Sequence, residues 1–480
     1  MTMLDPALSE ALVPPPEPPP APAAGAGDWA RRNLFRTWFD SVVTVVAAIV
    51  IGYVLYRLGR FVFVTGRWDI VQSNLTLFMV GRYPRDELWR IGVGLGAIAA
   101  YGRILAGYVQ RMRQITGREE RSTTALWRRL LDLAVRIWPL ILGVVVLLSL
   151  TTTPGPSVLT ILVVAAAVVG RIVGSFATRR WLLGVVIAGI VVPIAVVWFL
   201  SRPASWNEWE GMMLNLFLAI AGIALSFPLG VLLALGRRAG RRTDSPVGGA
   251  VVAATLALPV ILVLIRRGFD VTDVMTWVLI VLAVALAYGG YRIGRVTTLP
   301  LVRVVSIAYI EFFRGVPLYV LLLLGGIALG FFLPRGMETP GLVVRAIIVF
   351  TLFTAAYIAE IVRGGLQSLP RGQTEAAQAL GLKPVKTTAL IVLPQALRNV
   401  IPAIVGQFIS LFKDTTLAGA AMGLLDVLRV TNVATAQEDF RGQGLAPEAI
   451  SFVMFLFWVG CITMSRESQR LERRLGVGTR

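Results

Sequence analysis

Histidine is absent from this sequence of 480 residues, and cysteine occurs only once, at Cys461. Without histidine the chain has no imidazole for acid–base catalysis or for binding a metal ion. One cysteine cannot form an intrachain disulfide or a thiolate cluster, and its apolar surroundings predict a packing role. The Gly-Lys pair of nucleotide-binding P-loops is also missing. With no recognisable nucleophile motif, the chain is predicted not to be an enzyme and to hold no metal.

Lysine is scarce as well, with three residues among the 46 basic ones, although the net charge is +19. The arginines flank long apolar runs instead of forming one basic patch, so we expect no nucleic-acid partner. Hydrophobic residues make up 56% of the chain, above the roughly 45–50% of soluble domains. The mean hydropathy of +0.74 and the uncharged runs predict an all-α integral membrane protein in contact with lipid.

About twelve apolar runs approach the length that crosses a bilayer as a helix. They lie at about 41–64, 89–109, 134–152, 157–177, 182–200, 212–235, 249–266, 275–291, 317–334, 343–363, 397–420 and 448–464. Arg103 and Arg171 interrupt the second and fourth runs, which are therefore the weakest. Arginine near a helix end can still reach the interface, so both runs are kept as spans.

Arginine-rich connections set the expected orientation, because cytoplasmic loops of membrane proteins carry an excess of positive charge. Arginines precede the first run, and alternation then places the basic loops at 110–133 and 236–242 on the cytoplasmic side. Both termini are expected to be cytoplasmic. Residues 1–30 are rich in Pro and Ala and have no apolar core, which predicts a disordered tail and not a cleavable signal.

One cytoplasmic segment, EAAQALGLKPVKTTALIVLP at 375–394, is apolar yet poorly suited to insertion. Pro384 disfavours a straight helix, and two lysines oppose burial in lipid. The segment predicts two short helices joined near 381–384, the first ended by Gly381 and the second ending before Pro394. Such a helix could insert its small-residue face into a groove on a partner protein, with Glu375 at the rim.

The spacing within this segment resembles the signature loop of ABC importer permeases. The pattern is Glu-Ala-Ala, three residues, Gly, nine residues, and Ile-x-Leu-Pro. The resemblance implies that the loop docks onto separate ATPase subunits. The residues assigned to this contact are Glu375, Ala376, Ala377, Gly381, Leu382, Ile391, Leu393 and Pro394. A chance match by an amphipathic surface linker is the alternative.

The flanking sequences resemble the polar amino-acid uptake permeases over about 210–470. They are SFPLGVLLALGRR, YIEFFRGVPL, AAYIAEIVRGGLQSLPRGQ and LFKDTTL. The long N-terminal extension also resembles the general L-amino-acid permease M-type subunit. The resemblance implies a type I ABC importer transmembrane domain with extra N-terminal helices. About 240–300 departs from the family pattern, because two apolar runs are inserted there.

Four regions are expected on this basis. They are a disordered cytoplasmic tail at 1–30, a membrane extension of about five helices at 31–205, the permease domain at 206–470 with an inserted helix pair near 245–295, and a cytoplasmic tail at 471–480.

The resemblance also implies partners and a location. These are two ABC ATPase subunits, a second permease subunit that is related but different, and a periplasmic amino-acid-binding protein, all at a bacterial inner membrane. ATP and Mg would bind the ATPase subunits, so no cofactor is expected in this chain. The implied function is import of L-amino acids. A secondary transporter or channel without an ATPase is the alternative; it leaves the loop at 375–394 unexplained and predicts inverted repeats.

Charged residues near the apolar runs have two interpretations. Glu311 with Arg314, and Glu360 with Arg363, are spaced for ion pairs within one helix, and a structural role is favoured for them. Lys413 and Asp414 adjoin Thr415 and Thr416 late in a run. These four residues are candidates for the substrate pathway, because an amino acid carries both an ammonium and a carboxylate. A structural network between helices explains them equally well.

Overall fold

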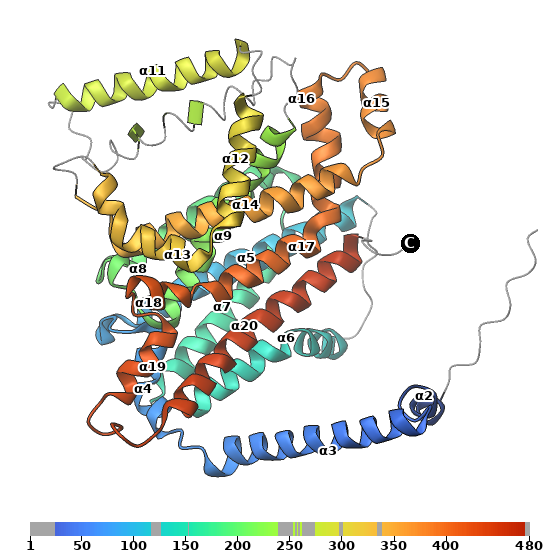
Figure 1. Cartoon of the computed structure of the whole chain (residues 1–480), viewed down its shortest axis with the longest axis vertical. Helices are drawn as coiled ribbons and strands as arrows, with labels where there is room; N and C mark the ends of the chain where they lie inside the picture. Colours follow the sequence, from blue (N-terminus) through green and yellow to red (C-terminus); the bar gives the residue numbers. More distant parts are fainter. Residues whose placement is uncertain are drawn as a thin grey trace, which may run out of the picture. The chain divides into compact units, whose positions relative to one another are not determined.

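The computed structural model describes residues 25–116, 126–151, 153–238, 274–296, 301–333 and 338–475, with five isolated residues between 253 and 261. Within these residues the fold is helical throughout, without a named strand, which confirms the all-α prediction (Figure 1). The chain divides into two compact units, Met1–Arg67 and Trp68–Arg480.

The first unit contains α2 (Ala26–Asn33), α3 (Trp38–Arg60) and the π-helical turn η1 (Phe61–Thr65). Thr37 and Asp40 form a capping box at the start of α3, with each side chain accepting the backbone N–H of the other residue. All residues of α3 are described and none is buried. An apolar helix exposed on every side is typical of a membrane span, where lipid or a neighbouring subunit covers it.

The second unit holds the remaining long helices. They are α5 (Trp89–Ile115), α6 (Leu126–Ser149), α7 (Gly155–Ser175), α8 (Leu182–Leu200), α9 (Gly211–Arg237), α11 (Val274–Val296), α14 (Leu342–Gln367), α17 (Leu393–Asp414) and α20 (Ala446–Leu475). Shorter elements connect them: α4 (Asp69–Val80), η2 (Arg85–Glu87), η3 (Arg179–Trp181), η4 (Trp206–Glu208), α12 (Leu301–Gly315), α13 (Leu318–Leu323), η5 (Leu324–Ala328), η6 (Leu329–Phe332), α15 (Gly372–Ala379), α16 (Pro384–Thr387), η7 (Thr388–Val392), α18 (Leu417–Met422) and α19 (Val427–Thr435).

Eight helices in the described part are long and apolar enough to cross a membrane, and a bent pair makes nine. The runs at 134–152 and 275–291 form shorter apolar helices, Ala134–Ser149 and Thr276–Arg292. The run at 249–266 lies almost entirely outside the described residues. These account for the twelve expected runs, and the two that arginine interrupts are spanning helices, α5 and α7.

The run at 317–334 differs from the expected straight span. It is broken into α13, η5 and η6, and together with α12 it forms a pair bent by 101°. Pro317 lies at the bend as the N-cap of α13, with an extended backbone. Proline has no N–H and disfavours helical geometry in the residue before it, so the helix stops and restarts here.

The core of the second unit is built around α9, α14 and α17. Figure 1 shows α14 running beside α9 and α17, and all three pairs are in contact. One cluster joins α9 and α14 to α13 and α18, with Leu214, Leu322 and Phe350 fully buried. A second cluster joins α9, α12, α14 and α17 through residues such as Ile310 and Ile358.

The short helix α4 is a structural element that the apolar runs did not predict. Ile70, Val71 and Phe78 on it are fully buried against α9, α19 and α20. Asn74 and Gln437 exchange two amide hydrogen bonds, of 3.0 and 2.7 Å. With twelve residues α4 is too short to span a bilayer, so a search for membrane helices passes over it.

The division into compact units falls at 67–68. The helix α4, which belongs to the 31–205 extension in sequence, packs against α9, α19 and α20. The expected tails at 1–30 and 471–480 are partly helical, because α2 begins at Ala26 and α20 continues to Leu475. Of the inserted pair near 245–295, the second helix is α11, and the first falls outside the described residues apart from isolated positions.

The helices α5 and α7 pack through their backbones along a stripe of small residues. A Cβ placed on Gly170 would lie 2.3 Å from the Ala100 carbonyl oxygen, and one on Gly174 would lie 2.4 Å from that of Ile104. Small residues four apart allow membrane helices to approach this closely. The two runs that arginine interrupts, at 89–109 and 157–177, are thus held by contact with each other.

Replacing Gly170 with leucine should separate α5 from α7, because the atoms it meets are backbone and cannot rotate away. Overpacking typically costs about 1–3 kcal/mol, and we expect the upper end here. The measurement is the apparent melting temperature of the detergent-purified chain. Gly102→Leu is the control, since a Cβ on Gly102 of the partner helix α5 meets nothing within 4 Å. Equal melting temperatures for the two variants would contradict the packing argument.

Candidate functional site

The segment at 375–394 folds as two short helices, as its sequence predicts. They are α15 and α16, and Figure 1 shows them side by side. The π-helical turn η7 follows, and α17 continues from it without a break. The expected end of the second helix before Pro394 is therefore wrong. The wide turn explains this: Leu393 donates to Thr388 five residues back, just before Pro394, which has no N–H to contribute.

Gly381 ends α15 in a left-handed conformation, with φ of 74°. Its N–H donates to the Gln378 carbonyl at 2.9 Å, and that of Leu382 donates to the Ala377 carbonyl at 3.1 Å. These two bonds define a Schellman motif, which favours glycine at the left-handed position. A Cβ on Gly381 would meet nothing within 4 Å, so within this chain the backbone conformation, and not crowding, selects glycine.

Some of the motif residues are covered within the chain, and the others are exposed on the surface of the loop. Ala377 is buried inside the chain, so it cannot provide the expected close approach to a partner. Leu382, Ile391 and Leu393 are half-buried and pack the loop internally. The exposed motif residues are Glu375, Ala376, Gly381 and Pro394. Leu380, which the sequence analysis did not select, is 83% exposed at the turn.

Ion pairs connect three helices near the end of α14. Arg363 donates through Nε to both carboxylate oxygens of Glu360, at 3.0 and 2.9 Å, which is the pair that the spacing predicts. Glu311 differs from the expectation: in the described residues it pairs with Arg237 of α9, at 3.3 Å, and not with Arg314. Glu360 also pairs with Arg237 at 3.2 Å and with Arg314 at 3.8 Å.

This arrangement makes Glu360 the centre of the cluster. It faces three guanidinium groups, from α9, α12 and α14, whereas the sequence spacing suggested two separate pairs within single helices. Arg237 was missed because its partners lie more than 70 positions away in the sequence. The neighbouring Arg238 donates to the Leu366 carbonyl at 3.3 Å. The cluster therefore fixes the ends of three helices at the side from which the 375–394 loop leaves.

The candidate pathway residues at the end of α17 have different environments. Lys413 is exposed, and Asp414 and Thr416 are half-buried. Thr415 is fully buried, accepts a hydrogen bond of 3.0 Å from Asn215 of α9 and donates one of 2.7 Å to the Phe412 carbonyl. Thr415 is thus committed to contacts within the chain, whereas Lys413 is exposed and Asp414 is only partly covered.

Asn215 belongs to a buried polar group that the sequence analysis did not find. Its side chain accepts the Val427 N–H at 2.9 Å, where α19 begins. Asp426 caps α19 by accepting the Arg429 N–H at 2.9 Å, and both Asn215 and Asp426 are fully buried. Apart from the N-cap spacing of Asp426, nothing in the sequence brings these residues together, because α9 and α19 are about 200 residues apart.

Burial raises the pKa of Asp426 to about 6, with the hydrogen bonds from Arg429 and Asn215 opposing the shift. A raised folded-state pKa means that the folded protein holds the proton more tightly than the unfolded chain. The resulting stability is present below about pH 4 and is lost as the pH rises through about 6. The largest possible loss is about 3 kcal/mol.

Asp426→Asn should remove this pH dependence, because asparagine caps a helix equally well and does not titrate. The apparent melting temperature of the parent chain should fall more between pH 5.0 and 7.5 than that of the variant. Asp439→Asn, on an exposed residue of the next connection, is the control and should behave as the parent. A variant with the parent's pH profile would contradict the assignment.

Comparisons of the sequence find related proteins of known class. The family described as "Binding-protein-dependent transport system inner membrane component" matches residues 290–477. The inner membrane amino-acid ABC transporter permease protein YhdY of Escherichia coli strain K12 is 29% identical over 97% of this chain and 97% of its own length. The glutamate/glutamine/aspartate/asparagine transport system permease protein BztC of Rhodobacter capsulatus is 33% identical over 85% of this chain and 78% of its own.

A solved amino acid ABC transporter with histidines matches 55% of this chain and 96% of its own, at 23% identity and a TM-score of 0.33. That score is too low to add to the assignment. The two sequence relatives, by contrast, extend through the N-terminal helices as well as the permease core. The chain therefore belongs to the family of amino-acid ABC transporter permeases, as a multi-pass membrane subunit of an ABC importer.

Proposed function

We propose that this chain conducts L-amino acids across a bacterial inner membrane and is driven through the 375–394 loop by separate ATPase subunits. The observation that carries the proposal is one uninterrupted helical run of 31 residues, Pro384–Asp414. It joins the second half of the loop to Lys413 and Asp414, about 45 Å away at 1.5 Å per residue. A displacement of the loop would move the other end as a lever.

The surface of the loop suits a protein partner. Leu380 and Leu390 are 83% and 66% exposed. Lys383 and Lys386 make the same loop too polar to lie in lipid, so lipid does not cover these leucines. Exposed apolar side chains of this kind pack into a groove on a partner, with the charged residues at the rim. The Schellman turn holds Leu380 in place, so the contact would be pre-formed and little conformational entropy would be lost on docking.

The substrate assignment rests on the relatives and on the end of α17. YhdY is named for amino acids, and BztC for glutamate, glutamine, aspartate and asparagine. An amino acid carries an ammonium and a carboxylate, and adjacent Lys413 and Asp414 offer the opposite charges. The exposed Lys413 and the half-buried Asp414 support a role in the pathway, whereas buried Thr415 would position α17 against α9.

The remaining parts of the proposed assembly are those that the family resemblance implies. ATP and Mg would bind on the ATPase subunits, and a periplasmic binding protein would deliver the amino acid. A related second permease would complete the pathway, and this chain would carry out no catalysis. Both termini and the 375–394 loop would lie on the cytoplasmic side, in line with the arginine-rich loops.

Affinity purification tests the proposal. The chain is tagged in its native cell, extracted in mild detergent, and its companions are identified by mass spectrometry. We expect a P-loop ATPase and a second permease, and ATP hydrolysis by the complex that rises when amino acid and binding protein are added. A chain that purifies alone and moves solute in liposomes without ATP would establish the secondary transporter instead.

A further inference from the structure

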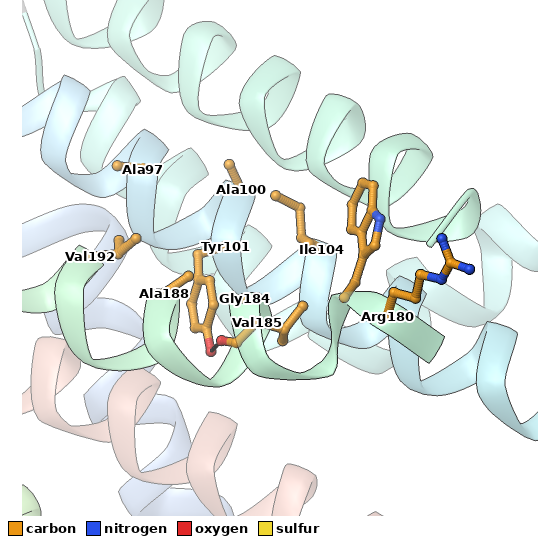
Figure 2. Close-up of a pocket in the computed structure, with 10 residues that line it drawn as sticks. Ala97, Ala100, Tyr101, Ile104, Arg180, Gly184, Val185, Ala188 and Val192 are labelled. Carbon is orange, nitrogen blue, oxygen red and sulfur yellow. Dashed lines mark hydrogen bonds between the residues drawn. The ribbon is translucent and has the colours of Figure 1, made fainter. Parts of the chain in front are cut away.

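A groove lies between α5 and α8 in the N-terminal extension, away from the coupling loop in sequence. Its volume is about 470 Å³, within the range of small-molecule sites. It is lined mainly by apolar or small residues: Ala97, Ala100, Tyr101, Ile104, Gly184, Val185, Ala188 and Val192, with Arg180 and Trp181 completing it. Figure 2 shows Tyr101 reaching toward Val185, whereas Arg180 lies apart from both, at one end of the groove.

The groove is polar at one end and apolar along the rest of its length. The Tyr101 hydroxyl is satisfied by donating to the Val185 carbonyl at 3.1 Å, so the middle of the groove offers no other side-chain hydroxyl or charge. Arg180 is exposed and has no carboxylate partner among the described residues. Trp181 beside it is 42% exposed, and tryptophan at a helix start is typical of the membrane–water interface.

The surroundings of the polar end are cationic. Met112 of α5 packs with Ala177 and Val185, which brings Arg111 and Arg113 to the same end as Arg179 and Arg180. No Asp or Glu occurs in the sequence between 133 and 207. Among the described residues, neither α5 (Trp89–Ile115) nor the stretch 153–206 supplies a carboxylate to this end, so its charge is complementary to an anion.

We propose that this groove binds an anionic phospholipid of the membrane. The acyl chain lies along Ala97, Ala100, Gly184 and Ala188, and the phosphate contacts Arg180. Basic pockets between membrane helices on the cytoplasmic side bind anionic head groups in this way. An amphipathic molecule with one long apolar part and one anionic end matches every feature of the lining.

Lipid is favoured over a helix of another protein by the surface around the groove. Leu183, Val186 and Ile190 of α8 and Val93 and Leu105 of α5 are all exposed apolar residues, so the groove opens onto a face that lies in hydrocarbon. A partner helix would cover Arg180 and require a carboxylate opposite it. A phospholipid leaves the arginine at the interface, where its charge stays hydrated.

Two variants separate the apolar and the charged contributions. A Cβ on Gly184 meets nothing within 4 Å, so Gly184→Leu fills the groove without straining the helix. Arg180→Gln removes only the charge at an exposed position. Gly102→Leu is the matched control, because Gly102 also has open space around it but does not line the groove. Unchanged helical circular dichroism and size-exclusion profiles verify that each variant folds.

The full-length chain, with any subunits that accompany it, is exchanged into micelles containing equal phosphatidylglycerol and phosphatidylcholine. Native mass spectrometry then counts the lipids that stay bound. We expect preferential retention of phosphatidylglycerol, roughly fivefold less of it in Arg180→Gln, loss of that lipid in Gly184→Leu, and no change in Gly102→Leu.

Three results would overturn the proposal. The first is that the parent chain and Arg180→Gln each retain phosphatidylglycerol and phosphatidylcholine in equal amounts. The second is full phosphatidylglycerol binding by Gly184→Leu. The third is a Gly184→Leu protein that keeps its lipid but loses an accompanying membrane subunit, since the groove would then hold a helix of that subunit.

Discussion

Replacing Gly381 with tryptophan should abolish amino-acid uptake while leaving insertion of the chain into the membrane intact. The φ of 74° at this position disfavours any side chain with a Cβ, and the indole would project from the exposed turn that carries Leu380. Both effects act on the face proposed to contact the ATPase. Uptake of labelled amino acid by intact cells is the measurement, with the amount of chain in the membrane determined by immunoblot. Normal uptake at an equal protein level would contradict the role assigned to the loop.

Two smaller substitutions distinguish the reasons for glycine. Asparagine enters the left-handed region more readily than alanine, although its side chain is larger. Since the space around Gly381 is open within the chain, backbone conformation should dominate, and Gly381→Asn should retain more uptake than Gly381→Ala. The reverse order would show that small size at the partner's surface decides, as the sequence resemblance alone suggested.

Replacing Glu360 with glutamine should destabilise the permease core more than any other single loss of charge in this cluster. The carboxylate faces Arg237, Arg314 and Arg363, and its removal leaves three cations at the ends of three helices. Breaking a fully buried pair costs about 3–5 kcal/mol. The side chain of Glu360 is 23% exposed, so we expect about 2–3 kcal/mol, read as a lower apparent melting temperature.

Glu311→Gln provides the comparison within the same cluster. Glu311 pairs with Arg237 at 3.3 Å and its side chain is 58% exposed, so water can replace the lost charge. Exposed pairs typically contribute about 1 kcal/mol or less. Equal destabilisation by the two variants would show that Glu360 is not the centre of the network. Because Arg237 ends α9, uptake by Glu360→Gln should also fall if the cluster holds the helices in register with the loop.

The sequence analysis predicted the two short helices of the 375–394 loop because the signals for them are local. Gly381 as a helix terminator, Pro384 at a helix start and the two lysines each act within a few residues, and the spacing resembles a known motif. The same reasoning placed the long apolar helices, since length and hydropathy are properties of a continuous run. It was wrong at Pro394 because a π-helical turn absorbs the missing hydrogen bond, and turn widths of that kind depend on the exact path of the helix.

The sequence analysis did not predict the polar contacts between helices. Glu360 shows this clearly: Arg363 is a neighbour in sequence and was found, whereas Arg237 is 123 positions away and was not. The Asn215 and Asp426 group and the Asn74–Gln437 amide pair arise in the same way, from segments 200 or more residues apart. Residues of this type are common in loops, so only their burial together distinguishes them.

The sequence by itself determined the class of protein, the apolar helices and the two short helices within 375–394, because hydropathy and turn chemistry are encoded in short stretches. Tertiary structure decided which helices meet, through contacts that no periodicity reports. Gly170 against the Ala100 carbonyl, α4 within the permease core and Arg180 at the mouth of a groove all depend on approach between distant segments. In a membrane every helix offers apolar surface, so complementary shape and polar pairing decide which helices pack together. These complementary surfaces exist only once the chain has folded.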